Sequence, residues 1–229
     1  LASEAMYRFL LRPRWILSHL VVLALIVAMI LAMFWQIRRL DEKKTRNELI
    51  TARADIPAIP VADALRRAGV TRPSQGEAVD YRAAWVEGTY RPDEEFTIPS
   101  RTLNGAPGRL VVTPLRPADG GTDVLVLRGF IPQAVDDTRA PIDGVEPPTG
   151  PVRVQGWLRA SEEPDGFFQE TAVDVGDGNY ARIDIARLER ARRARFAPAY
   201  LLLGRQTPPT SARSLSLYPL PERSEGPHF

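Results

Sequence analysis

The chain has 229 residues, with 30 Lys and Arg against 28 Asp and Glu, and it contains no cysteine. A net charge of only +2 gives no basic footprint of the kind that nucleic-acid-binding domains show, so we expect no nucleic-acid partner. The lack of cysteine excludes disulfides, thiolate metal sites and a cysteine nucleophile. Of the 21 prolines, 20 follow residue 50, which excludes a bundle of long helices there.

An uninterrupted apolar segment lies near the N-terminus. Sixteen apolar residues run from Leu20 to Trp35, and no formal charge occurs between Trp15 and Ile37. About 21 residues of helix span about 31 Å, which matches the hydrocarbon thickness of a bilayer. The sequence therefore predicts a transmembrane helix over 15–37, with interfacial tryptophans at both ends.

A cleaved signal peptide is the alternative for this segment. Such a peptide has a shorter apolar core followed by small residues, whereas the charged stretch FWQIRRLDEKK (34–44) follows here, so we expect a retained anchor. The count of Arg and Lys near the two ends favours the C-terminal side as cytoplasmic, but the chain begins with Leu1 and we expect further residues before it. The helix is expected to continue past the membrane until Pro57 and Pro60 end it.

The remainder, 61–223, is predicted to be a β-rich domain. A short amphipathic helix is expected at 60–70 and a second at 184–195, with Asp184 as its N-cap. Alternating apolar and polar residues, separated by Gly, Asn and Asp turns, predict strands. These strands are expected at 81–90, 95–103, 108–115, 123–132, 151–160, 179–186, 200–206 and 214–220. The overall expectation is a membrane-anchored α+β protein whose domain is an antiparallel barrel or sandwich.

Residue patterns for catalysis are missing from this domain. The two histidines are His19 and His228, so no Ser/His/Asp arrangement forms within it, and its glycines lie in turns instead of a phosphate-binding loop. We expect Glu94–Glu95 and Glu162–Glu163 to be solvated turn residues and the protein not to be an enzyme. The arginine-rich stretch 187–195 is either a solvated helix face or a contact for lipid phosphates or an acidic partner surface.

Four segments resemble the SURF1 family of cytochrome c oxidase assembly proteins. FWQIRRLDEKK (34–44) is similar to a family motif in Trp35, Gln36, either Arg38 or Arg39, and Lys43, although Met33 replaces a glycine. NGAPGRLVVTPL (104–115) and VLVLRGFIP (124–132) resemble two further motifs, the latter with Phe130 in place of tryptophan. EGPHF (225–229) resembles the entry to the family's second transmembrane helix.

The resemblance implies a membrane-anchored chain with 61–223 outside the cytoplasmic membrane or in the intermembrane space. The excess of Arg over Lys favours a bacterial source, in which case 1–14 is cytoplasmic and 38–60 is a membrane-proximal helix and linker. Residues 224–229 would enter a second transmembrane helix beyond the end of the sequence. The implied function is assistance in haem a insertion or in maturation of the catalytic oxidase subunit. His228 is then the residue for transient haem a binding, since imidazole suits an axial position.

Two other functions stay open at this stage. One is an accessory subunit retained on the mature oxidase or respiratory supercomplex, and the other is a membrane-anchored module that binds a small ligand or peptide. For both the assembly factor and the accessory subunit, the expected partners are haem-copper oxidase subunits and membrane lipid.

Two sets of residues receive specific roles. Ala24, Ala28 and Ala32 form a small-residue face, and with Trp35, Gln36 and Arg38 they are the predicted partner contacts in the membrane. The motif residues Arg128, Gly129, Phe130 and Pro132 are predicted to shape the domain, with Arg128 on the same strand face as Val126 and Phe130. A buried Arg128 requires a carboxylate or carbonyl partner.

Overall fold

The computed structural model describes residues 13–53, 56–133, 144–162, 180–210 and 215–220. The chain divides into two compact units, of which the second comprises Leu49–Glu222.

The first unit is dominated by helix α2 (Pro13–Arg53), whose last turn already belongs to the second unit. This helix is 41 residues long, and its apolar part is long enough to cross a bilayer. Residues 13–39 are all exposed, so the apolar side chains have no protein core around them. The charged stretch after Trp35 stays helical as far as Arg53, which confirms the predicted extension. Pro57 and Pro60 follow, and proline cannot continue a helix.

The second unit is built from seven strands and short helices. The strands are β1 (Ile59–Pro60), β2 (Ala83–Tyr90), β3 (Phe96–Leu103), β4 (Ala106–Pro117), β5 (Val124–Pro132), β6 (Pro151–Ala160) and β7 (Ala199–Thr207). The helices are α3 (Val61–Arg67), α4 (Ile185–Arg192) and the 3₁₀ turns η2 (Pro73–Val79) and η3 (Pro92–Glu94).

Five of the strands close into a barrel. The sheet order is β1-β2-β6-β7-β5-β4-β3, and an additional pairing between β2 and β4 joins the ring. Around the ring the strands follow the order β2-β4-β5-β7-β6 and return to β2, and β5 and β7 run parallel. If these five strands are numbered 1 to 5 in chain order, the ring is 1-2-3-5-4-1, which is the connectivity of an OB-fold barrel. The predicted barrel is therefore confirmed, but the expectation of a purely antiparallel sheet was wrong, because the described β5–β7 and β1–β2 pairs are parallel.

Barrel closure depends on a glycine at the β2–β4 seam. Gly88 lies opposite Pro117, and a Cβ atom on Gly88 would lie 2.1 Å from the carbonyl oxygen of Arg116. Real Cβ atoms do not approach an oxygen so closely, so only glycine lets β2 reach β4 here. Beyond Tyr90 the chain turns through η3, and β3 then continues along the same edge of β4.

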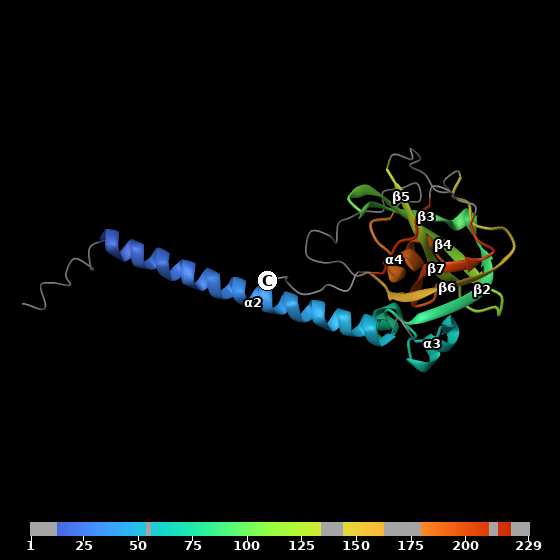
Figure 1. Cartoon of the computed structure of the whole chain (residues 1–229), viewed down its shortest axis with the longest axis horizontal. Coiled ribbons are helices and arrows are strands. Elements are labelled where there is room, and N and C mark those ends of the chain that lie inside the picture. The colour runs from blue at the N-terminus through green and yellow to red at the C-terminus, as the bar shows by residue number, and fades with distance from the viewer. Residues whose placement is uncertain (1–12, 54–55, 134–143, 163–179, 211–214, 221–229) are drawn as a thin grey trace, which may run out of the picture. The chain divides into compact units, whose positions relative to one another are not determined.

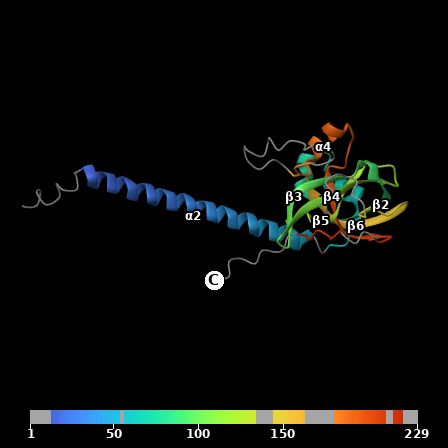
Figure 2. The same ribbon diagram turned by 90° about the horizontal axis from the view of Figure 1, so that it is seen from above.

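The two larger apolar cores lie on opposite sides of the barrel wall, and Val111, Ile131 and Val145 form a third, small cluster. The inner core gathers alternate residues of the barrel strands and is closed by Val61 and Ala64 of α3. The outer core places Ile185 and Leu188 of α4 against β3, β4 and β5 (Figures 1 and 2). The sequence pattern explains both cores, since β5 is apolar on both of its faces and is buried along nearly its full length.

Two predicted strands were wrong. Residues 180–184 form no strand, although Ile183 is buried, because Asp184 caps α4 through a hydrogen bond from the Arg187 amide (3.0 Å) and so turns the chain. The described residues 215–220 make a single bridge, between Ser216 and Phe130. This bridge lies on the edge of β5 that pairs with β7 at the earlier residues Val126 and Leu127.

Gly88→Ala is expected to destabilise the domain by about 1–3 kcal/mol, because the added methyl group forces β2 away from β4. Thr89→Ala, on the exposed neighbouring residue of the same strand, is the control and should change stability by less than about 0.5 kcal/mol. Urea unfolding of the full chain in detergent, followed by near-ultraviolet circular dichroism, measures both. Equal stability of the two variants would contradict the role of Gly88.

Candidate functional site: a polar barrel interior and two adjoining depressions

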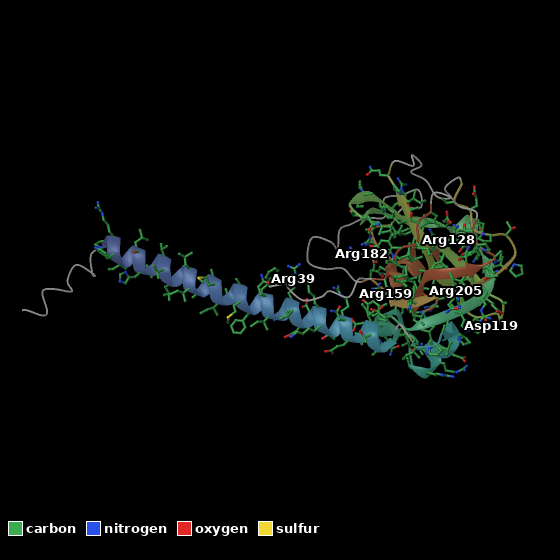
Figure 3. All side chains as sticks on the ribbon, viewed as in Figure 1. Arg39, Asp119, Arg128, Arg159, Arg182 and Arg205 are labelled. Carbon is green, nitrogen blue, oxygen red and sulfur yellow. The ribbon has the colours of Figure 1, made fainter. Side chains whose placement is uncertain are left out.

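A charged pair is buried inside the barrel. Nη1 of Arg128 lies 2.9 Å from Oε2 of Glu95, and the two side chains are 0% and 1% exposed. The same carboxylate oxygen accepts a hydrogen bond from the Thr113 hydroxyl at 2.6 Å. The Tyr90 ring lies 5.6 Å from the Arg128 guanidinium carbon, and its hydroxyl donates to Oε1 of Gln206 at 2.9 Å. Side chains of four strands and the turn before β3 thus form one polar chain, and Figure 3 labels Arg128 among the strands.

Backbone geometry explains why these side chains point inward. Glu95 and Thr97 alternate with Phe96 and Ile98, which places the polar pair on one face and the apolar pair in the outer core. Arg128 is the extra residue of a β-bulge, since Leu127 pairs with Val112 but Gly129 pairs with the preceding residue, Val111.

The bulge corrects one prediction about β5. Simple alternation placed Phe130 on the face of Val126, but the extra residue shifts the alternation by one, so Phe130 joins Leu125 and Leu127 in the outer core. Arg128 keeps an inward direction beside Thr113 and Glu95. The prediction that Glu95 is a solvated turn residue was wrong. The polar alternation Glu95–Thr97 beside buried Phe96 was the signal that indicated an inward carboxylate.

The other residues of the Arg128 motif have packing roles in the structure. A Cβ atom on Gly129 would lie 2.4 Å from the Ser216 carbonyl oxygen, so glycine is needed where residues 215–216 approach the edge of β5. The backbone of Phe130 exchanges two hydrogen bonds with Ser216, at 2.7 and 3.0 Å. Pro132 is the last residue of β5.

The residues of segment 104–115 also have structural roles, in a turn, a close strand contact and the barrel interior. Asn104 and Gly105 both have positive φ, 51° and 80°, and form the two-residue hairpin turn between β3 and β4. A Cβ atom on Gly108 would lie 2.2 Å from the Ile131 carbonyl oxygen. Thr113 is the hydroxyl donor to Glu95, so this segment and the Arg128 motif meet in the barrel interior.

The polar interior is incompletely paired within the described part of the chain. Nε and Nη2 of Arg128 and Oε1 of Glu95 are buried and have no hydrogen-bond partner there. Unsatisfied buried donors and acceptors are costly, so these atoms reduce the net stabilisation from the pair.

The second predicted pair of solvated glutamates is Glu162–Glu163. Glu162 forms an ion pair with Arg101 at 2.7 Å. Glu163 lies outside the described residues.

A groove opens on the surface beside α3. It has a volume of about 860 Å³ and lies between α3, residues 85–87 of β2 and the loop 117–122. Its apolar wall includes Val61, Leu65 and Val86, and its charged lining residues are Asp63, Glu87, Asp119 and Arg66. Three carboxylates against one guanidinium make the lining acidic; this surface is called the acidic groove below. Figure 3 labels Asp119.

A second depression of about 410 Å³ adjoins it, with Gly121 and Thr122 lining both. Its charged lining residues are Arg91, Arg116, Asp123 and Arg195, so this surface, called the arginine depression below, is basic.

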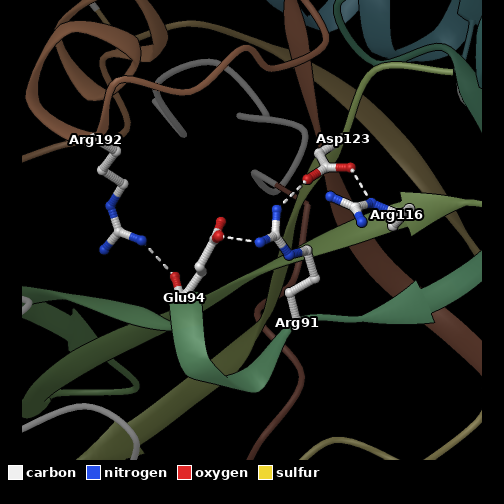
Figure 4. A network of polar contacts seen from close by, with 5 residues as sticks. All are labelled: Arg91, Glu94, Arg116, Asp123 and Arg192. Carbon is white, nitrogen blue, oxygen red and sulfur yellow. Dashed lines mark hydrogen bonds and ion pairs between the residues drawn. The ribbon is translucent and has the colours of Figure 1, made fainter.

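Figure 4 shows how the arginine depression is held together. Arg91 donates to Asp123 at 2.9 Å and also pairs with Glu94, while Nε of Arg116 lies 3.5 Å from the same aspartate. The hydrogen bond to Asp123 raises the pKa of Arg91, so its guanidinium stays protonated. Arg192 of α4 donates to the Glu94 carbonyl oxygen at 2.5 Å. Arg116 and Arg195 are 63% and 88% exposed, and within the described part of the chain their carboxylate contacts are 3.5 Å long, which leaves both guanidinium groups available to an anion.

The residues predicted for partner binding lie on α2. Ala24, Ala28 and Ala32 recur every four residues in one continuous helix, which puts them on one face, and all three are exposed. Trp35, Gln36 and Arg38 are exposed as well, and the guanidinium of neighbouring Arg39 lies 5.3 Å from the Trp35 ring centre. His228 and the entry to a second membrane helix lie outside the described residues.

Comparison with known proteins decides the family. The model of the SURF1 family matches residues 22–228, which is nearly the whole chain. The chain belongs to the SURF1 family. An uncharacterized SURF1-like protein of Mycobacterium bovis, and one of Mycobacterium tuberculosis, are 29% identical over 178 residues, covering 73% of this chain. A SURF1-like protein of Monosiga brevicollis is 32% identical over 148 residues, covering 59% of this chain and 52% of its own length.

The match with the mycobacterial proteins covers 63% of their length, so this chain spans less than two thirds of those relatives. The SURF1 match also includes the buried Arg128, the hairpin at Asn104–Gly105 and most of α2. Sequence reasoning found those segments but missed Glu95, Tyr90 and the two surface depressions.

Replacing Arg128 by Met is expected to destabilise this SURF1-family domain by about 3–5 kcal/mol, because Glu95 is then left as a buried, unpaired charge. The double variant Arg128→Met/Glu95→Leu should recover most of that loss, since no buried charge is left. Thermal unfolding of the two single variants and the double variant completes the cycle. Strictly additive losses would show that the two side chains do not depend on each other.

The domain should lose stability above pH 10. Burial raises the pKa of Tyr90 above the ordinary value near 10, although the positive charge of Arg128 lowers it in part. Burial likewise raises the pKa of Tyr200. The unfolded chain releases these protons at a lower pH than the native state, so the unfolding free energy falls by about 1.4 kcal/mol per pH unit for each tyrosine. Tyr90→Phe should remove about half of this slope between pH 10 and 12, measured by urea unfolding. An unchanged slope would contradict the assignment to Tyr90.

Proposed function

We propose that this SURF1-family protein is a membrane-anchored assembly factor for haem-copper cytochrome c oxidase and that it is not an enzyme. The observation that carries the proposal is the family match over residues 22–228. The structure is compatible with this role, because the chain combines a helix long enough to cross a bilayer with a closed barrel whose outer surface offers two depressions for a partner.

The proposal places the barrel domain on the outer side of the bacterial cytoplasmic membrane and the oxidase subunits beside α2. Ala24, Ala28 and Ala32 support a contact within the membrane, because small residues let two helices approach closely. Membrane lipid surrounds the remaining faces of the helix.

Haem a is part of the proposal as a transient ligand of His228. Within the described residues the single histidine is His19, near the start of α2, and no group of three potential metal ligands occurs. His228 lies outside the described residues, and no step of the proposal passes through haem. The absorption spectrum of the natural full-length protein, purified from a haem a-producing host, compared with that of His228→Ala, tests this assignment.

Co-purification tests the main proposal. The tagged full chain, extracted in mild detergent, should recover oxidase subunits from cells that are assembling the enzyme, and less of them from cells whose oxidase is already complete. Deletion of the gene should lower the amount of active oxidase. Stoichiometric recovery with the mature oxidase would instead make the protein an accessory subunit, and recovery of no oxidase subunit would contradict both functions.

Ala28→Phe is expected to weaken this association several-fold, because a phenyl group separates two helices that pack through small residues. Ile30→Phe is the matched control, since residue 30 lies about 200° further round the helix and is already bulky. Quantitative mass spectrometry of the co-purified oxidase measures both variants, and thermal unfolding of each verifies the barrel domain. Undiminished recovery with Ala28→Phe would show that the alanine face points to lipid.

A further inference from the structure

The acidic groove and the arginine depression carry opposite charge on the two sides of one loop. The lining of the acidic groove contains Asp63, Glu87 and Asp119 against Arg66. The lining of the arginine depression contains Arg91, Arg116 and Arg195 against Asp123. Gly121 and Thr122 line both, so the two surfaces are continuous across this loop.

The acidic groove combines charge with an apolar wall. Part of its charge is balanced within the chain, because Asp63 pairs with Arg66 and Glu87 pairs with Arg153, both at 2.8 Å. Asp119, which also lines the groove, instead accepts a hydrogen bond from the Gly121 amide at 3.0 Å and has no ion-pair partner among the described residues. Val61, Val86 and Val124, which line the groove, also belong to the inner core, so the groove reaches down to buried apolar side chains. An occupant that fits it carries apolar side chains with a cationic group beside them.

The arginine depression has the complementary property. Arg91 is held by two carboxylates and is not available, but Arg116 and Arg195 are largely exposed and only loosely paired. Two guanidinium groups beside the backbone of a Gly-Gly turn suit carboxylates, which arginine binds through paired N–H donors.

We propose that the two surfaces together dock one segment of a partner polypeptide, in which apolar and basic side chains occupy the acidic groove and acidic side chains lie over the arginine depression. An anionic lipid headgroup fits only the second surface, and a nucleic acid is repelled by the first. A polypeptide offers all three chemistries within a few residues. The inference rests on the proposed function for the identity of the partner, which is a subunit of the oxidase.

Site-specific photo-crosslinking tests the surface in the full, membrane-inserted chain. Thr122, which lines both surfaces, is replaced by p-benzoylphenylalanine, and the matched control carries the same group at exposed Thr102 near the β3–β4 hairpin. The expected result is a crosslink from position 122, and not from 102, to an oxidase subunit that mass spectrometry identifies. Crosslinks to lipid alone from position 122 would overturn the proposal.

Charge reversal tests the orientation of the segment. Arg195→Glu and Asp119→Arg should each lower the crosslinking yield from position 122 about fivefold or more at low salt, and less at high salt. Arg109→Glu, near the other end of β4 from Arg116, is the control and should leave the yield unchanged. Thermal unfolding verifies that each variant is folded. A yield that neither reversal changes would overturn the proposal.

The outcomes separate the two proposals. Recovery of oxidase subunits by the unmodified chain without a crosslink from position 122 leaves the assembly function standing and removes the docking surface. A charge-dependent crosslink to a polypeptide that is not part of the oxidase, together with recovery of no oxidase subunit, supports the docking surface and contradicts the assembly function.

Discussion

The buried ion pair between Arg128 and Glu95 organises the interior of the barrel domain. Arg128 and Glu95 come from a bulge in β5 and from the turn before β3, and each needs the other because an unpaired charge in this interior is strongly unfavourable. Thr113 and Tyr90 add a hydrogen bond and a ring contact from β4 and β2. These four residues therefore require four segments of the chain to be in register at once. Buried ion pairs contribute little net stability compared with apolar residues of similar size, but loss of one partner leaves an unpaired buried charge, so the pair constrains which residues can stand at these two positions.

The segments that resemble the SURF1 family acquire a physical explanation from this interior. Arg128 supplies the buried cation, Gly129 lets residues 215–216 approach the edge of β5, and the hairpin at Asn104–Gly105 leads into the strand that carries Thr113. None of these residues lies in the acidic groove or the arginine depression. The motif residues in the barrel thus maintain the fold, and partner recognition is better sought on the surface and on α2.

The acidic groove and the arginine depression depend on closure of the barrel at the β2–β4 seam. Loop 117–122 begins where Gly88 lets β2 reach β4, so the seam that closes the barrel also positions the loop between the two depressions. The loop stays attached to β2 beyond that seam, through the hydrogen bond from the Ala118 amide to the Glu87 carbonyl oxygen at 2.8 Å. Strand closure and the proposed recognition surface are therefore linked through a few backbone contacts.

The sequence by itself determined the features that depend on local pattern. The apolar length of α2, the cap at Asp184 and six of the strands follow from periodicity, turn residues and capping chemistry, which act over a few neighbouring residues. The tertiary structure decided what depends on distant partners. The parallel β5–β7 pair, the inward turn of Glu95, the bulge that redirects Phe130 and the meeting of the two depressions at Gly121–Thr122 arise only when segments far apart in the chain are brought together. A one-residue bulge reverses the face of every residue after it, and alternation along a single strand contains no information about the partner that induces it.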